Sequence, residues 1–464
     1  MFQKHRMIMT FIAVLIALAA CLCLAAWGGR TDGSPGNEAG DEEETESFEG
    51  YYFEDDDDED APEDDEDDGL TPDELGMLNL VQAKDTEEVE IPEGEEDTPV
   101  EAPDEEERQD LHDSPESEYF YDQLSPEEQE TYDLILAGIR RMETGEIDVT
   151  ITDMDRVQEI VHLLLSENPD LFWYDNYTLW YYTHGDEVSR VSVQFEYNCD
   201  EAERGRRQEL IDRETEAILA GAPEGDDYAK IRYVYEQIIM NTDYVTDSPD
   251  NQNICSVFLN HESVCHGYAL AAQYLLNRMG IDCVSVDGDA GGRHTWSLVW
   301  SDGEPYYMDV TWGDPTGDPS GTGDEDAAEG GGDPADNLTY NYLLLTGEEM
   351  GRGHHPDPVY SLPDCTAVAD NYFVREGLYM ESWDPAAFTD IISRNFSNGE
   401  YGAAVKFANR AAFDEAYEAL LSGDGAWRFV EGLPGRENLS MYWYSPGEEH
   451  LEDLEIYAIS LEFE

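Results

Sequence analysis

The chain has 464 residues, enough for two or three domains, and its formal net charge is −85. The acidic residues are not confined to one tail: residues 38–118 hold 39 of them against two basic residues, and residues 119–464 hold 69 against 19. Nucleic-acid binding needs a basic surface, so this charge excludes it, and it also disfavours anionic lipid headgroups. Basic protein or peptide partners would be attracted.

Residues 1–30 predict a targeting segment. Lys4 and Arg6 precede an apolar run over residues 7–27. The sequence Leu-Ala-Ala-Cys at 18–21 resembles a bacterial lipobox, in which Cys21 would carry the lipid. The run is also long enough, at ~20 residues, to remain as an uncleaved anchor, and cleaved secretion is a third alternative. All three place the rest of the chain outside the cytoplasmic membrane, so we expect an extracytoplasmic protein held at the membrane by a lipid or a helix.

Residues 31–118 predict an acidic, disordered linker. Residues 54–68 are almost entirely Asp and Glu, and the whole stretch has few apolar residues. Such a sequence cannot bury enough apolar surface to offset its chain entropy, and self-repulsion extends it.

Residues 119–225 predict an N-terminal α/β extension. Ser125, Pro126 and Glu128 form a helix-capping box, and a second helix is expected over 157–165. Paired strands over 179–182 and 188–197 and a helix over 204–219 complete the extension. Its aromatic residues fit a core better than a platform for cell-wall glycans.

The most informative stretch is Ser-Val-Cys-His-Gly-Tyr-Ala at 263–269, followed by a helical pattern to residue 279. A cysteine that opens a helix meets unpaired N–H groups and the positive end of the helix dipole. That environment favours the thiolate, the nucleophilic form. Cys265 is therefore the candidate nucleophile, and Gly267 would leave the space in front of its sulfur open.

Two later stretches, 294–300 and 306–312, predict strands joined by a short turn. In this hairpin His294 and Asp309, 15 positions apart, would lie close enough for an imidazole–carboxylate hydrogen bond. A helix packed on the hairpin would bring Cys265 to the other imidazole nitrogen. The three residues then form a nucleophile, a base and a residue that orients the base.

These motifs, Val264–Ala269, Gly280–Ile281, His294–Trp296 and Tyr306–Pro315, together resemble the transglutaminase-like superfamily, in particular its bacterial extracytoplasmic members. The resemblance covers roughly residues 228–346 and implies catalytic roles for Cys265, His294 and Asp309. Ser297 and Gly313 depart from the family pattern outside these three residues. The resemblance leaves the reaction open, because members include amide hydrolases and cross-linking acyltransferases.

Several residues around the triad are weaker candidates. The Cys265 backbone N–H and the Gln252 side chain are candidate oxyanion donors, and Gly267 and Trp296 would line the substrate site. After the hairpin, residues 313–336 form an acidic, glycine-rich insert, which we interpret as a flap beside the site. Calcium binding there is an alternative, although no EF-hand spacing is present.

The sequence predicts no metal centre. A zinc site built from His261, Cys265 and His266, or from His354 and His355, is the rival to a nucleophilic cysteine, but the spacings match no zinc motif. Pairing among the remaining cysteines is left open; these are Cys199, Cys255, Cys283 and Cys365.

The predicted fold class is α+β. Residues 226–370 form a papain/transglutaminase-like catalytic domain, in which the nucleophile helix packs on an antiparallel sheet that a core strand at 341–345 completes. Residues 371–464 form a small α+β module, with helices over 384–396 and 411–421 and strands over 402–407, 439–444 and 454–461.

The predicted function is an anchored cysteine-dependent acyl-transfer enzyme acting on amide bonds, either a peptidase or amidase or a cross-linking enzyme. Hydrolysis is favoured because nothing specifies an amine site. The alternative is a non-catalytic surface binding or assembly protein that keeps the same fold. The substrate and the oligomeric state stay open.

Overall fold

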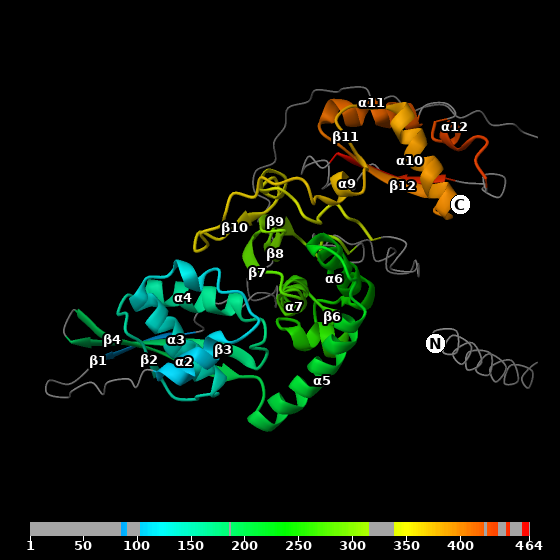
Figure 1. Cartoon of the computed structure of the whole chain (residues 1–464). Coiled ribbons are helices and arrows are strands. Elements are labelled where there is room, and N and C mark those ends of the chain that lie inside the picture. Colours follow the sequence, from blue (N-terminus) through cyan, green and yellow to red (C-terminus); the bar gives the residue numbers. More distant parts are fainter. Residues whose placement is uncertain are drawn as a thin grey trace, which may run out of the picture. The chain divides into compact units, whose positions relative to one another are not determined.

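The computed structural model describes residues 85–90, 103–184, 187–314, 338–421, 425–434, 442–445 and 457–463. They all belong to one unit, Gly69–Glu464, and combine helices with sheets (Figure 1). The predictions for the leader with Cys21, for most of the acidic linker and for residues 315–336 of the insert fall outside these segments. None of the helices described here has both the length and the apolar character needed to cross a bilayer.

The first sheet has the strand order β1-β3-β4-β2. Its centre is the antiparallel hairpin of β3 and β4, where Leu179 lies opposite Val193 and both side chains are buried. The predicted helices and strands of this region are confirmed, including the capping box of Ser125 and Glu128. The bounds are Asp85–Glu90 (β1), Glu105–His112 (α2), Tyr121–Gln123 (η1), Pro126–Arg140 (α3), Ile147–Asp148 (β2), Met154–Glu167 (α4), Tyr174–His184 (β3) and Glu187–Tyr197 (β4).

The prediction that the linker extends to residue 118 is wrong. Strand β1 pairs in parallel with β3, and α2 is capped by Asp104, whose side chain accepts a hydrogen bond from the Glu107 N–H. Farther on, Glu116 is buried and forms an ion pair with Arg278 at 2.7 Å. Backbone pairing and ion pairs order this acidic segment, and neither depends on the apolar content from which disorder was predicted.

Two helices lead from the first sheet to the nucleophile. Helix α5 (Glu201–Ala220) is capped by Asp200 and α6 (Asp227–Asn241) by Asp226. Beyond α6, the short strands β5 (Asp243–Tyr244) and β6 (Glu262–Ser263) pair in parallel. Between those strands lies the short helix η2 (Ser256–Asn260). The chain therefore enters the nucleophile helix from a fixed strand.

The second sheet has the order β10-β7-β8-β9, with every pair antiparallel. The predicted hairpin is confirmed as β8 (Arg293–Ser301) and β9 (Glu304–Met308), with Ser297 opposite Met308. Helix α7 (Cys265–Arg278) packs on the strand β7 (Cys283–Asp289), where the Gln273 side chain accepts from the Ser285 backbone N–H at 3.0 Å. A helix that begins at Cys265 on an antiparallel sheet is the arrangement expected from the sequence.

The predicted core strand at 341–345 is absent from the described structure. Leu344 has a φ of +58°, which no strand residue adopts, and only Leu345 forms a bridge, to Tyr307. The residues that follow form α8 (Gly347–Met350), β10 (His355–Pro356) and α9 (Tyr372–Arg375). The apolar pattern predicted burial correctly, since 342–345 are buried, but not the backbone conformation.

The C-terminal module has the strand order β11-β12-β14-β13. The predicted helix and strand over 384–407 are confirmed as α10 and β12, whereas the last two strands lie a few residues later than predicted. The bounds are Tyr379–Met380 (β11), Pro385–Asn398 (α10), Gly402–Phe407 (β12), Arg410–Leu421 (α11), Trp427–Val430 (α12), Tyr442–Ser445 (β13) and Ala458–Phe463 (β14).

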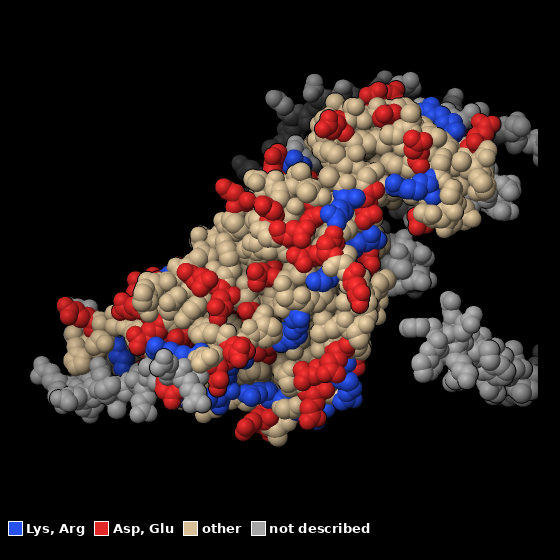
Figure 2. All heavy atoms as spheres, viewed as in Figure 1, with Lys and Arg blue, Asp and Glu red and all other residues tan. Residues whose placement is uncertain are grey.

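The surface carries charged side chains of both signs, interspersed with one another. On the face shown in Figure 2, acidic side chains are spread over the surface and basic side chains lie among them. Several arginines are paired within helices, as Arg232 is with Glu236 at 2.6 Å. Pairs this exposed contribute about 0–1 kcal/mol each, so they do not determine the fold.

Candidate active site

Cys265 is the first residue of α7. Its N-cap residue, Val264, is extended (φ −120°, ψ −179°) and offers no capping side chain. The N–H groups of the first helical turn therefore have no partner within the helix and point toward its open end, where an anion is favoured. The Cys265 side chain lies at this end and is 2% exposed.

Gly267 is required for close packing at the start of α7. A Cβ atom at this position would lie 2.1 Å from Ser263 Oγ and 2.6 Å from Ser256 Oγ. Those two hydroxyls are themselves hydrogen-bonded at 2.6 Å. The missing side chain thus allows Ser256 and Ser263 to pack against the start of α7.

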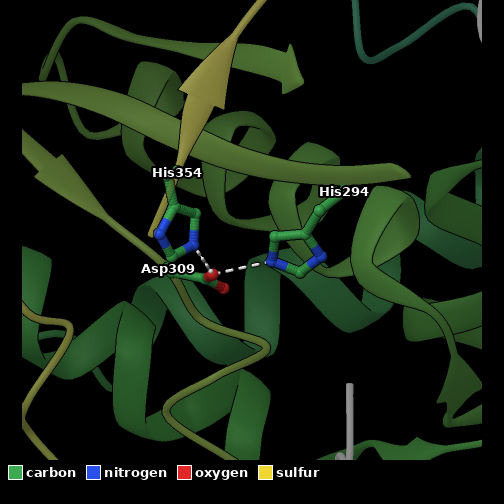
Figure 3. A group of neighbouring side chains, drawn as sticks. All are labelled: His294, Asp309 and His354. Carbon is green, nitrogen blue, oxygen red and sulfur yellow. Dashed lines mark hydrogen bonds and ion pairs between the residues drawn. The ribbon is translucent and has the colours of Figure 1, made fainter. Parts of the chain in front are cut away.

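His294 lies near the start of β8 and is hydrogen-bonded to Asp309, which follows the end of β9. The His294 Nε2 to Asp309 Oδ2 distance is 2.7 Å (Figure 3). A carboxylate only accepts, so Nε2 carries the proton and Nδ1 is left for Cys265. Burial lowers the pKa of His294, but the negative charges of Asp309 and Cys265, with hydrogen bonds to both, raise it to about 10.

Asp309 is completely buried and fully hydrogen-bonded. Its Oδ1 accepts from the backbone N–H groups of Thr311 and Trp312 at 2.9 and 3.1 Å. Its Oδ2 accepts from His294 and also from His354 Nε2 at 2.9 Å. Burial would raise the pKa of Asp309, but the charge of His294 and the hydrogen bonds from both imidazoles hold it well below its usual range.

His354 was missed as a member of this site. It lies 45 residues after Asp309, in the loop that precedes β10, and no motif places it near the hairpin. The sequence interpretation considered it only as a zinc ligand beside His355. In the folded chain its ring contacts the aromatic rings of Trp296, Trp312 and Tyr342, which are distant from it in sequence.

Among the residues that the structure describes, one group has the composition of a metal site, namely His294, Asp309 and His354. One potential ligand atom from each of them lies within 4.8 Å of the other two. Ligands of a tetrahedral zinc, with bonds of ~2.0 Å, stand ~3.3 Å apart. The two contacts to Asp309 Oδ2, at 2.7 and 2.9 Å, are shorter and match hydrogen bonds. The geometry therefore favours a proton-carrying cluster.

The other predicted residues lie elsewhere or face the core. The Gln252 amide donates to its neighbour Asn251 at 3.1 Å, so it is turned toward its own loop. Trp296 is 1% exposed and packs its ring against His294 and His354, which makes it a wall behind the imidazoles. Each of the five cysteines within the described segments is a free thiol.

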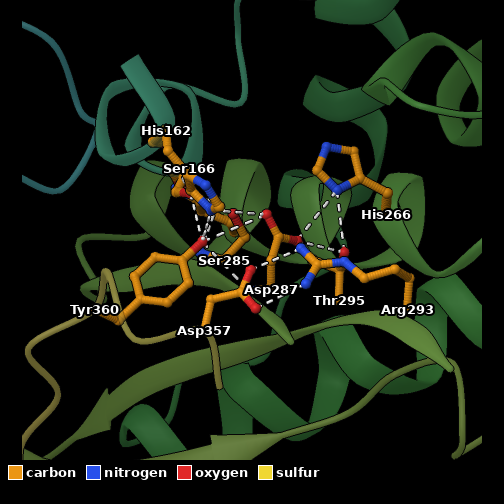
Figure 4. A network of polar contacts seen from close by, with 10 residues as sticks. His162, Ser166, His266, Ser285, Asp287, Arg293, Thr295, Asp357 and Tyr360 are labelled. Carbon is orange, nitrogen blue, oxygen red and sulfur yellow. Dashed lines mark hydrogen bonds and ion pairs between the residues drawn. The ribbon is translucent and has the colours of Figure 1, made fainter. Parts of the chain in front are cut away.

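A second buried carboxylate, that of Asp287, lies in a network of polar contacts (Figure 4). Asp287 in β7 accepts from the Thr295 hydroxyl at 2.6 Å and lies 3.7 Å from His266 Nδ1 and 3.2 Å from His162 Nε2. His266 follows Cys265, and Thr295 follows His294. The same network therefore joins the neighbours of both candidate catalytic residues to α4 of the first sheet region.

No protein-family model matches the chain, and no curated protein matches it. Among solved structures it is similar to a TGase (13% identity, TM-score 0.21), to a candidate cysteine protease from Cytophaga hutchinsonii (15%, 0.19) and to the periplasmic domain of TgpA from Pseudomonas aeruginosa (20%, 0.19). These matches cover 29, 29 and 26% of this chain and 50, 61 and 55% of those structures. Similarity at such TM-scores carries no functional argument.

Proposed function

We propose that this protein is an extracytoplasmic, membrane-anchored enzyme that transfers acyl groups from amide bonds through Cys265. The observation that carries the proposal is the placement of His294. Its Nε2–H donates to the buried Asp309 at 2.7 Å, and Cys265 is hydrogen-bonded to the same imidazole. The charge of Asp309 raises the pKa of this buried imidazole and so favours the imidazolium, the partner that a catalytic thiolate requires.

In the proposed reaction, the Cys265 thiolate attacks an amide carbonyl carbon and forms a C–S bond. Backbone N–H groups of the first turn of α7 are the donors for the developing oxyanion. His294 gives its Nδ1 proton to the leaving amine as the C–N bond breaks, and a thioester remains. Water then attacks the thioester, His294 takes its proton, and the C–S bond breaks to release the acid.

Hydrolysis is the proposed outcome, and an amine in place of the water would give cross-linking by the same steps. The net charge of −85 favours basic peptides or proteins as substrates. The apolar run at residues 7–27 supports an anchored, extracytoplasmic location. The alternative of a non-catalytic surface binding protein is favoured by one observation, the 2% exposure of Cys265.

Casein, a mixed protein substrate, distinguishes these outcomes. New amino termini would report peptide hydrolysis, ammonia would report reaction at glutamine side chains, and species of higher mass would report cross-linking. We expect Cys265→Ala to lower whichever signal appears by at least ~10³-fold without unfolding the protein. Turnover that survives in the Cys265→Ala variant would overturn the proposal.

A further inference from the structure

We propose that His354 is a positioning residue, which holds the carboxylate of Asp309 toward His294 by donating a hydrogen bond from its Nε2 to Asp309 Oδ2. The inference rests on the proposed function and adds a fourth member to its machinery. His354 would act on the catalytic pair only through its hydrogen bond to Asp309.

The position of His354 is tightly fixed. Its backbone N–H donates to Met350 at 2.9 Å, and its side chain is 2% exposed. The indole rings of Trp312 and Trp296 lie 4.5 and 5.0 Å from its ring, the second edge-on. With no room to rotate, the imidazole keeps Nε2 at 2.9 Å from Asp309 Oδ2 (Figure 3).

The two imidazoles on this oxygen have opposite electrostatic settings. Burial lowers the pKa of His354, the charges of His294 and His355 lower it further, and Asp309 only partly offsets these effects. The pKa of His294 is raised to about 10. When two titratable groups in one site have pKa values shifted in opposite directions, they take different roles in proton transfer. The charged form is therefore favoured at His294 and disfavoured at His354.

The hydrogen bond from His354 matters because of how Asp309 is held. Its Oδ1 is fixed by two backbone N–H groups, those of Thr311 and Trp312, whereas its Oδ2 meets only the two side chains. Without His354, the second lone pair of Oδ2 loses its donor in a site that solvent does not reach. The carboxylate can then tilt away from His294, and the imidazolium that sustains the thiolate loses its anchor.

The test measures alkylation of Cys265 by iodoacetamide in the full chain, resolved by peptide mass spectrometry at pH 6 and pH 9. Phenylalanine in His354→Phe keeps the ring but not the donor, and the amide nitrogen of glutamine in His354→Gln reaches the position of Nε2. We expect the rate at pH 6 to fall by roughly 10- to 100-fold in His354→Phe and to stay within about threefold in His354→Gln. The rate at pH 9 should change little in either variant.

Three controls keep the result interpretable. Cys283, whose thiol pKa is raised by burial, should remain unlabelled in every folded variant. His294→Ala tests the proposed function separately: if the wild type is slow at pH 6 and indifferent to that change, the enzyme proposal itself fails. If His354→Phe does not fold, His354→Asn replaces it, because the shorter asparagine amide cannot reach Oδ2.

The inference is overturned if the non-donating variant labels like the wild type at pH 6 while His294→Ala is slow. It is also overturned if His354→Gln is as slow as the non-donating variant, because then the ring and not its donor would matter.

Discussion

In the described part of the chain, two buried aspartates each lie between two histidines, and only one of the two is proposed to serve chemistry. Asp309 meets His294 and His354, and Asp287 meets His162 and His266. Burial alone would raise both pKa values, yet the imidazoles hold both well below the usual range. Their charge states are alike, so charge alone does not distinguish a site from a structural junction.

The difference lies in the contacts. The shortest contact of Asp287 is to a hydroxyl, that of Thr295 at 2.6 Å, and the Nε2 of His162 is shared with the Tyr360 hydroxyl at 2.6 Å. Asp309 has imidazole nitrogens as its nearest side-chain partners, and one of those rings also faces Cys265. A buried imidazole–carboxylate pair therefore indicates catalysis only where a nucleophile reaches the second ring nitrogen.

The largest effect is expected from Asp309→Asn. An asparagine must aim its NH₂ group at one of two sets of donors, either the imidazole Nε2–H groups or the backbone N–H groups of Thr311 and Trp312. His294 then loses its anion and its fixed tautomer. We expect turnover to fall by roughly 10³- to 10⁴-fold, the loss seen when a triad aspartate is replaced in this way. Activity within tenfold of the wild type would remove Asp309 from the mechanism.

Asp287→Asn should lower the stability of the protein but leave the reactivity of Cys265 nearly unchanged. Two histidines and Thr295 lose their anion, and breaking a buried pair in this way costs about 3–5 kcal/mol of unfolding free energy. Alkylation of Cys265 at pH 6 should stay within about threefold of the wild type, since no contact links Asp287 to His294.

The matched control for that variant is Asp357→Asn. Asp357 pairs with Arg293 at 2.7 Å in a partly exposed position, where a pair contributes about 0–1 kcal/mol. Denaturant unfolding measures both variants. A stable Asp287→Asn protein that has lost its reactivity at pH 6 would show that the second cluster belongs to the active site.

The smallest effect on the active site is expected for a buried carboxyl that has no imidazole partner, because its pH dependence concerns stability. Burial raises the pKa of Glu167 to about 8, against hydrogen bonds from the Phe120 and Tyr121 backbone and the Tyr132 hydroxyl. A folded pKa above the unfolded value gives stability that is full below pH 4.5 and is lost as pH rises through 8. Glu167→Gln removes this slope, so the unfolding free energies of variant and wild type should diverge between pH 5 and pH 8. Parallel pH curves would contradict the assignment.

The three motif residues were predictable because each lies in a short pattern whose local structure follows from sequence. Cys265 opens a helix, and a tight hairpin brings His294 near Asp309. His354 was not predictable, because its approach depends on the fold of residues 338–356 across a long insert. The extension of order into the acidic stretch was missed for a related reason, since β1 and Glu116 are held by partners distant in sequence.

The most direct test of the account is the rate of Cys265 alkylation by iodoacetamide between pH 5 and pH 9 in the wild type and in His294→Ala. An ordinary cysteine is only ~0.3% thiolate at pH 6. The account predicts fast labelling at pH 6 in the wild type and a fall of roughly two orders of magnitude in the variant, with similar rates at pH 9. Slow labelling at pH 6 that is indifferent to His294 would contradict it, and would favour a binding protein that keeps the fold.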